Sequence, residues 1–289
     1  MKHTPDIPAA TWRARLSLDV RRDGDGRSVV RAAHEGPLRL LKTLYPEGAA
    51  IAHAVVVHPP GGIVGGDRLE VALHLQPRTH ALVTTPGATR FYRSAGGAAA
   101  QHVTAALAGG ARLEWLPLET IAHGGCLAEN RARFELAAGA EMIGWDVLAL
   151  GLPASDAPFT AGRFTQHLEL AGVWLERGVI DAADATLLRS PLGLAGRSTL
   201  LTLWFAAGQV QADARADALV DAARACVDAL GADDERVVAG VTALQQRVVV
   251  LRALAHRVEP AMALAQAVRA AWRRIGWQLD ATAPRVWRT

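Results

Sequence analysis

Apolar and polar residues alternate through the first two thirds of this 289-residue chain, most clearly between about residues 50 and 180. In the stretch DRLEVALHLQP, for example, Leu69, Val71 and Leu73 fall on one side, while Glu70 and His74 fall on the other. A period of two residues is the pattern of a β-strand with one buried face. We therefore expect a mainly β protein whose β body occupies residues about 12–205.

Four stretches of this region share one plan, in which a strand, a turn of small residues and a second strand follow one another. They read LHLQPRTHALVTT, VTAALAGGARLEWLP, RFELAAGAEMIGWDV and QHLELAGVWLERGVI, with turns at Arg78, Gly109–Gly110, Gly139 and Gly172. We expect each of them to be hairpin-like. The turns recur roughly every thirty residues, the interval expected of similar units that stack in layers. The pattern favours an elongated stacked-sheet or β-helical, solenoid-like body, and a plain β-sandwich stays open as the alternative.

The last third of the chain changes period and predicts two late α-helices, near residues 213–230 and 259–276. The first has apolar residues every three or four positions and Gly231 just after them, as helices often end. The second has an apolar stripe of Leu264, Val268, Trp272 and Ile275. Between them, GVTALQQRVVVLRALAH predicts a pair of strands. Since no linker-like composition sets off this part, about residues 211–289, we expect one domain over residues 1–289.

Charge and cysteine content narrow the class of protein. The net charge of +3 is too mild to imply nucleic acid, although eight arginines from Arg247 onward face only two carboxylates. A solvated helix face is the simplest interpretation of these arginines. Cys126 and Cys226 lack any CxxC partner, as in a reduced cytosolic protein. Because there is neither a signal-like start nor a run of 18 apolar residues, we expect a soluble, cytoplasmic protein without a membrane contact.

The glycine-rich stretch HPPGGIVGGD (58–67) resembles a phosphate-binding loop only in its spacing. Gly61 and Gly66 are separated as in GxxxxGK[ST], but Asp67 and Arg68 stand where the lysine and the hydroxyl residue belong. A strand pattern follows, so no helix N-terminus is available for an anion. We interpret the stretch as a rigid turn between two strands, with Asp67 accepting hydrogen bonds from the amides of the turn.

Metal and catalytic motifs are absent from the sequence. The ten histidines include no zinc-type spacing, and HExxH and GxSxG do not occur. Two carboxylates nevertheless stand in apolar surroundings, Glu119 in WLPLETI and Asp146 in GWDVLALGLPAS. Acidic residues in such places are either paired structurally or functional, and both interpretations stay open.

Seven motifs in order then suggest a family. They are HPPGGIVGGD, TTPGATRFYRS, LPLETI, GWDVLALGLPAS, SPLGLAG, RALAHRVEP and PRVW. Each is weak alone, but as an ordered series they resemble the urease accessory protein UreD (UreH) family from about residue 30 to 287. The resemblance implies a β-rich, somewhat solenoid-like protein with a pair of late helices, which agrees with the pattern above.

The resemblance also implies a function, that of a non-enzymatic maturation factor for the nickel enzyme urease. Family members bind the helical accessory protein UreF and, through it, the GTPase UreG, and this assembly docks on apo-urease. No tightly bound cofactor is expected, and nickel is expected only in transit. The alternative is a pure scaffold that bridges the GTPase complex to urease without conducting nickel. A small-molecule hydrolase is a third and more distant class.

A nickel carrier must release its cargo, so a polar passage lined by oxygens suits it better than a closed cage of thiolates and imidazoles. Polar side chains within apolar or strand-forming motifs are the candidates for such a lining. They are Thr84, Thr85, Glu119, Asp146 and Glu176. For the contact with UreF we expect the late helices and the PRVW tail to contribute. The candidate residues there are Leu264, Val268, Trp272 and Arg273, although such a stripe often serves only core packing.

Overall fold

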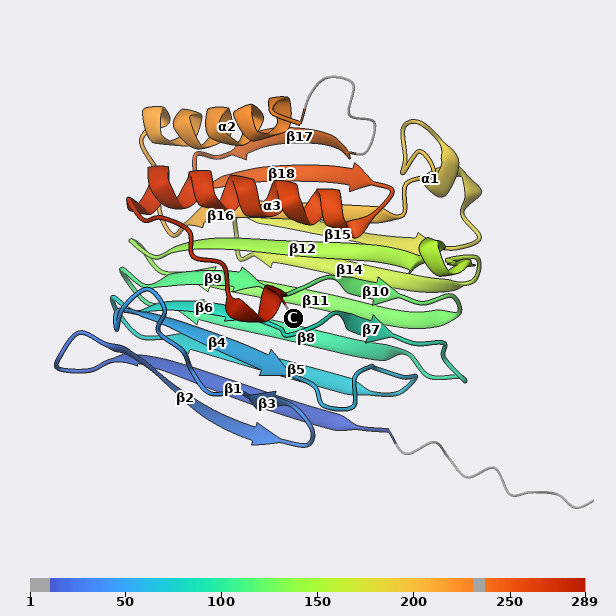
Figure 1. Cartoon of the computed structure of the whole chain (residues 1–289), viewed down its shortest axis with the longest axis horizontal. Helices are drawn as coiled ribbons and strands as arrows, with labels where there is room; N and C mark the ends of the chain where they lie inside the picture. Colours follow the sequence, from blue (N-terminus) through green and yellow to red (C-terminus); the bar gives the residue numbers. More distant parts are fainter. Residues whose placement is uncertain (1–10, 231–236, 289) are drawn as a thin grey trace, which may run out of the picture.

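The protein is a stack of β-strands in which two sheets face each other and helices cover one of them. The computed structural model describes residues 11–230 and 237–288. Strands follow the sequence from one end of the stack to the other, from the N-terminal pair β1 and β2 to the late strands β17 and β18 (Figure 1). The expected mainly β, solenoid-like body with two late helices is confirmed.

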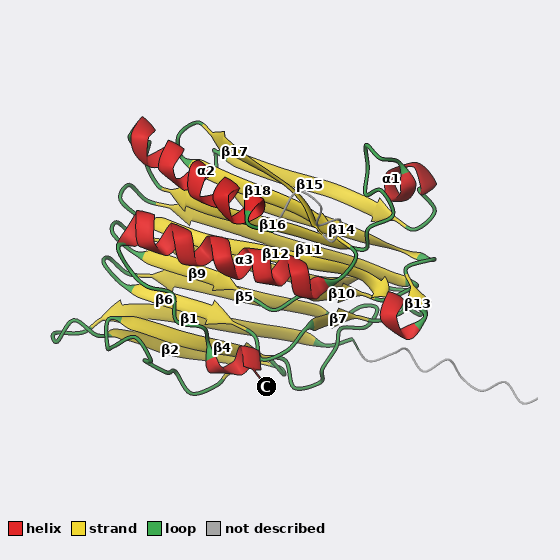
Figure 2. Cartoon of the chain, turned by 45° about the horizontal axis from the view of Figure 1, so that its top comes forward, coloured by secondary structure: helices red, strands yellow, loops and turns green. Residues whose placement is uncertain are grey.

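The first sheet has seven strands in the order β15-β14-β11-β8-β5-β1-β2. Their bounds are β1 Arg13–Arg22, β2 Ser28–Glu35, β5 Arg68–Leu75, β8 Ala99–Leu107, β11 Cys126–Leu136, β14 Gly162–Leu170 and β15 Trp174–Asp181. We call it the open sheet, because no helix covers its outer face in Figures 1 and 2.

The second sheet, here the covered sheet, has the main order β17-β18-β16-β12-β9-β6-β4-β3. Its strands are β3 Arg39–Leu40, β4 Ile51–Val57, β6 His80–Thr84, β9 Arg112–Leu116, β12 Glu141–Leu152, β16 Thr199–Ala207, β17 Val237–Leu244 and β18 Val248–Ala255. Three short strands extend it off this path, namely β7 Thr89–Phe91, β10 Thr120–Ala122 and β13 Ala157–Pro158.

The chain winds between the sheets, so that equivalent strands of successive windings pair in parallel. In the open sheet β5, β8, β11 and β14 are parallel neighbours, and in the covered sheet β4, β6, β9 and β12 are. The turns at Arg78, Gly109–Gly110 and Gly139 therefore join strands of opposite sheets, and the expectation of hairpins is wrong there. Only the fourth turn, at Gly172, closes an antiparallel hairpin, between β14 and β15.

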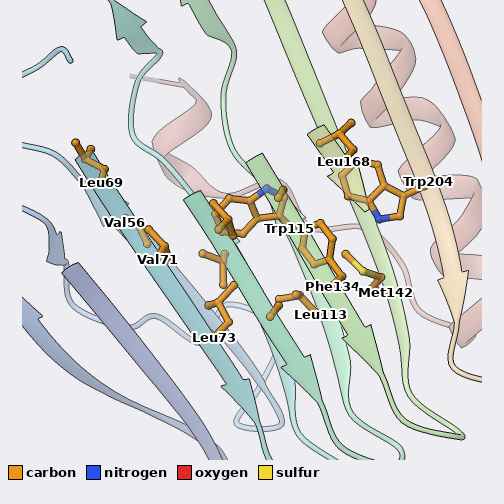
Figure 3. Close-up of a cluster of buried hydrophobic side chains, with 14 of the residues drawn as sticks. Val56, Leu69, Val71, Leu73, Leu113, Trp115, Phe134, Met142, Leu168 and Trp204 are labelled. Carbon is orange, nitrogen blue, oxygen red and sulfur yellow. The ribbon is translucent and has the colours of Figure 1, made fainter. Parts of the chain in front are cut away.

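Alternation along the strands produces a core between the sheets. Side chains of both sheets meet there, including Val71, Trp115, Phe134 and Trp204, as Figure 3 shows. These four side chains are at most 7% exposed. Burying aromatic and branched side chains of this size stabilises the fold by roughly 1.5–3 kcal/mol each.

Helices cover the outer face of the covered sheet and bury a second core. Helices α2 (Asp213–Asp228) and α3 (Val258–Trp272) lie side by side across its late strands (Figure 2). A π-helical turn, η2 (Arg273–Trp277), continues α3. The remaining helical segments are η1 Pro153–Ser155, α1 Ala185–Arg189 and η3 Arg285–Arg288. Within the described residues, no helix is long and apolar enough to cross a membrane.

The stretch HPPGGIVGGD is the connection from β4 in the covered sheet to β5 in the open sheet. Gly61 and Gly66 take positive φ angles of 78° and 93°, which favours glycine. Asp67 accepts hydrogen bonds from the amides of Val64 (3.0 Å) and Trp12 (2.8 Å). The interpretation as a rigid turn is confirmed, since its one acidic side chain holds the loop and the N-terminal strand together.

Candidate functional site

A row of polar side chains crosses the core between the sheets. The open sheet contributes Gln101 (β8), Asn130 (β11), Gln166 (β14) and Glu176 (β15). The covered sheet contributes Asp146 (β12), Thr202 (β16) and Arg252 (β18). We call these seven residues the polar belt. The registers explain the row, because Asn130 pairs with both Gln101 and Gln166 in one sheet, and Thr202 pairs with both Asp146 and Arg252 in the other.

Hydrogen bonds connect the belt across the two sheets. Asp146 accepts from Asn130 Nδ2 at 2.8 Å and from Gln166 Nε2 at 2.5 Å. Gln101 Nε2 lies 3.4 Å from Asn130 Oδ1. Further along, Glu176 accepts from the Thr202 hydroxyl at 3.0 Å. The belt thus consists of two hydrogen-bonded groups, one around the buried Asp146 and one around Glu176 nearer the surface.

Asp146 is the electrostatic centre of the belt. Burial raises the pKa of Asp146 to about 7 from its ordinary 3.8, although the hydrogen bonds from Asn130 and Gln166 favour the ionised form. The negative charge of Glu176 raises this pKa further. A carboxyl group with this pKa exchanges its proton near neutral pH.

Apolar layers enclose the belt on both sides. Phe164 and Leu168 flank Gln166 on the inner face of β14, and Leu200 and Trp204 flank Thr202 on β16. The Trp204 indole N–H is buried and has no acceptor among the described residues. The Trp204 ring packs against Phe134 and Trp174, with ring centroids 5.6 and 5.7 Å apart, and so belongs to the apolar layer beside the belt.

Thr84 and Thr85 border a cavity of about 310 Å³ that Gln101 also lines, but the Thr84 side chain points to the helix-covered face of β6, where Trp287 lies. The Thr84 hydroxyl donates to the Leu116 carbonyl (2.6 Å) and accepts from Trp287 Nε1 (2.8 Å). Thr85 Oγ1 accepts from the Leu118 amide (2.9 Å). Both hydroxyls therefore have structural partners, and Gln101 alone links their cavity to the belt.

Glu119 lies apart from the other candidates. It is partly exposed and borders a different cavity, of about 850 Å³, together with the N-terminal residues of α3. The structure therefore brings Asp146 and Glu176 together, places Thr84 and Thr85 near one end of their row, and leaves Glu119 outside it.

The apolar stripe expected to contact a partner faces the protein's own sheet. Leu264, Val268, Trp272 and Arg273 are at most 1% exposed. Trp272 packs on Phe205 and donates its indole N–H to the Leu219 carbonyl of α2 (2.8 Å). These four side chains form internal contacts, so a partner reaches them only if α3 leaves the sheet.

An ionic cluster that the sequence analysis missed fastens α3. Glu114, fully buried on β9, accepts from Arg269 Nε (2.7 Å) and Arg273 Nη1 (2.5 Å), and lies 3.1 Å from His80 Nε2. Burial alone would raise the pKa of Glu114, but these cations hold it far below its ordinary value. Arg273 also binds Glu47. Two of the late arginines are therefore buried counter-ions, and the expectation of a solvated face is wrong for them.

The belt offers oxygen and amide ligands and no dense metal cage. Among the residues that the structure describes, no group of three or more His, Cys, Asp or Glu side chains is arranged to hold a metal ion. Cys126 is buried, and burial raises the pKa of its thiol to about 11, which leaves it protonated at neutral pH.

Comparison with known proteins then decides the family. The UreD urease accessory protein family matches residues 13–288, almost all of the chain. The chain belongs to the UreD family. A protein from Leptothrix cholodnii named urease accessory protein UreD is 58% identical over 280 residues, which cover 96% of this chain and 100% of the relative.

Other UreD proteins agree with this assignment. Proteins of the same name from Paracidovorax citrulli and Variovorax paradoxus are each 54% identical, covering 96% of this chain and 99% and 100% of theirs. Membership of the UreD family supports a role in urease maturation, and the relatives are named as accessory proteins rather than as enzymes.

Proposed function

We propose that this chain is a non-enzymatic maturation factor that delivers nickel to apo-urease and helps to assemble its metal centre. In this proposal it acts in the cytoplasm, in a complex with UreF and, through UreF, with the GTPase UreG. Two observations support it, the UreD family match and a hydrogen-bonded row of polar side chains through an otherwise apolar core.

The chemistry of the belt suits a cargo that must move on. Nickel binds imidazole and thiolate tightly, whereas the seven belt side chains present carboxylate, amide and hydroxyl groups and one arginine. At Asp146, whose pKa is about 7, a proton competes with the cation at neutral pH. Nickel held in this way would be exchangeable, as delivery to another protein requires.

The path that we propose runs along the belt. It begins at the cavity lined by Thr84, Thr85 and Gln101, and continues past Asp146 to Glu176. Thr84 and Thr85 would border the cavity end, while Asp146 and Glu176 would supply the negative charge that attracts a divalent cation. Glu119 would lie beside, not on, this path.

For UreF, we propose the outward face of the α2–α3 layer. The inner stripe of α3 is buried, but Ala267 on its other side is exposed, as are Arg274 and Ile275 in the following turn η2. Small residues on an exposed helix allow another helix to approach closely, and Ile275 adds an apolar contact. Docking there would require no rearrangement of the fold.

Co-expression of urease, its other accessory proteins and belt variants of this chain tests the nickel path. Asp146→Ala and Glu176→Ala are expected to lower the nickel content of purified urease about tenfold while the accessory complex still assembles. Glu135→Ala is the matched control, because Glu135 is an exposed carboxylate on β11, outside the belt. If the belt variants assembled the complex and gave urease with normal nickel content, the belt would not be a nickel path. The pure scaffold function would then remain.

A further inference from the structure

The belt reaches the protein surface beside β15, the edge strand of the open sheet, where it ends in the ion pair of Glu176 on β15 with Arg252 on β18. Arg252 Nε and Nη2 each lie 2.6 Å from Glu176 Oε2. The Arg252 side chain is 48% exposed and that of Glu176 27%, whereas Asp146 is 7% exposed. This is the end of the belt at which a cation would enter from, or leave to, a docked protein.

Both oxygens of Glu176 are already occupied at this exposed end. Arg252 binds Oε2, and Oε1 accepts the Thr202 hydroxyl at 3.0 Å. Arg252 is also the one cationic member of the seven-residue belt. A divalent cation that approached Glu176 would meet both a blocked carboxylate and the repulsion of the guanidinium.

The exposure of this pair sets it apart from the buried arginines on Glu114. Arg269 and Arg273 are at most 2% exposed, so moving either would leave a buried charge unpaired, at a large cost. An ion pair that is partly in water contributes little, because water compensates both charges when it opens. Arg252 can therefore swing into solvent, whereas Arg269 and Arg273 cannot.

We propose that Arg252 is a displaceable counter-ion that closes the exposed end of the belt, limiting the access of divalent cations to Glu176 until it is displaced. The inference rests on the proposed nickel path and adds a positioning residue to it. Arg252 need not touch the metal, since its effect is exerted through the availability of Glu176.

Equilibrium dialysis of the full-length chain against nickel chloride tests this proposal. Arg252→Gln is expected to raise the affinity for Ni²⁺ about fivefold, the effect of removing one partly exposed charge partner. Arg252→Lys, which keeps the charge, is expected to stay close to the wild type. Arg252→Gln combined with Glu176→Gln is expected to lose the gain, because no carboxylate is then released.

The matched control is Arg177→Gln, which makes the same change of charge on the residue after Glu176. Arg177 points to the outer face of β15, away from the belt, so its replacement is expected to leave the affinity unchanged. Thermal unfolding of each variant checks that the fold is retained.

The outcomes separate this inference from the nickel path itself. The role of Arg252 would be overturned if Arg252→Gln bound Ni²⁺ no more tightly than the wild type. The same holds if neither protein bound Ni²⁺. If Asp146→Ala and Glu176→Ala still impaired nickel delivery to urease, the path would stand without this counter-ion. Equal gains for Arg252→Gln and Arg177→Gln would show a general effect of charge and would also overturn it.

Discussion

At the scale of single residues, the burial of Asp146 stands out, because a strand interior rarely holds a lone carboxylate without a cation. Its hydrogen-bond partners are the side-chain amides of Asn130 and Gln166. The one charged side chain that shifts its pKa is Glu176, whose negative charge raises it. The ionised form is thus stabilised only by neutral donors. The sequence pattern alone identified Asp146 as unusual. The structure adds that its ionised form destabilises the fold, because the carboxylate is buried without a cation.

The pH dependence of stability follows from this burial. Because the folded-state pKa of Asp146 is raised above the unfolded value, the folded state binds the proton more tightly between pH 3.8 and about 7, and stability is lost as the pH rises through that window. The ionised carboxylate costs at most about 4 kcal/mol at pH 8. Asp146→Asn is therefore expected to raise the free energy of unfolding by about 1–3 kcal/mol at pH 8 and by much less at pH 5.

Urea denaturation at the two pH values measures this difference. Asp217→Asn, on the exposed side of α2, is the control that changes the same group in water. A gain for Asp146→Asn that is equal at pH 5 and pH 8 would contradict a raised pKa at this site.

At the scale of elements, α3 is fastened by charge as well as by apolar packing. Arg273 donates to Glu114 on β9 and to Glu47 before β4, so one side chain links the end of α3 to two separate parts of the chain. Arg273→Met removes this link and leaves buried carboxylates short of a counter-ion. We expect a loss of about 3 kcal/mol in the free energy of unfolding.

The neighbouring Arg274 supplies the comparison. Its side chain is 69% exposed and lies 3.7 Å from Asp280, so Arg274→Met is expected to change the stability by less than about 1 kcal/mol. Denaturant unfolding of both variants by far-ultraviolet circular dichroism checks the contrast. Similar losses in the two would show that the Glu114 cluster is not what fastens α3.

Elements also show what the sequence can and cannot predict. Alternation located the strands, and the three-to-four spacing located both late helices. Neither pattern says whether a turn joins strands of one sheet or of two, because the inward residues are the same in both cases. The turn at Gly139 was therefore predicted as a hairpin, although it carries the chain from the open to the covered sheet.

The candidate site was predictable only in part, for a related reason. A carboxylate in an apolar strand is visible in sequence, which is how Asp146 was found, and the same signal in RLEWL would have found Glu114. Asn130, Gln166 and Arg252 carry no such signal, since polar residues in strands are common. Their role depends on the register of pairs far apart in the chain, such as Thr202 with Arg252.

At the scale of the whole molecule, the two faces of the covered sheet have different roles. Its outer face is buried under α2 and α3 and gives the late helices a fixed position, which suits a docking layer. Its inner face forms the core with the open sheet and carries three of the seven belt residues. The proposed docking layer and the proposed nickel path therefore lie on opposite faces of one sheet, and we expect variants of one to leave the other intact.

The most direct test of an internal nickel path is transfer in the presence of a chelator. The assembled accessory complex, loaded with nickel and bound to apo-urease, is treated with excess EDTA, and the nickel in re-isolated urease is measured by mass spectrometry. Our account predicts that the wild-type complex still delivers nickel, because the belt shields the ion, and that a complex with Asp146→Leu delivers about tenfold less. Delivery that EDTA abolishes in the wild type, or that Asp146→Leu leaves unchanged, would contradict it.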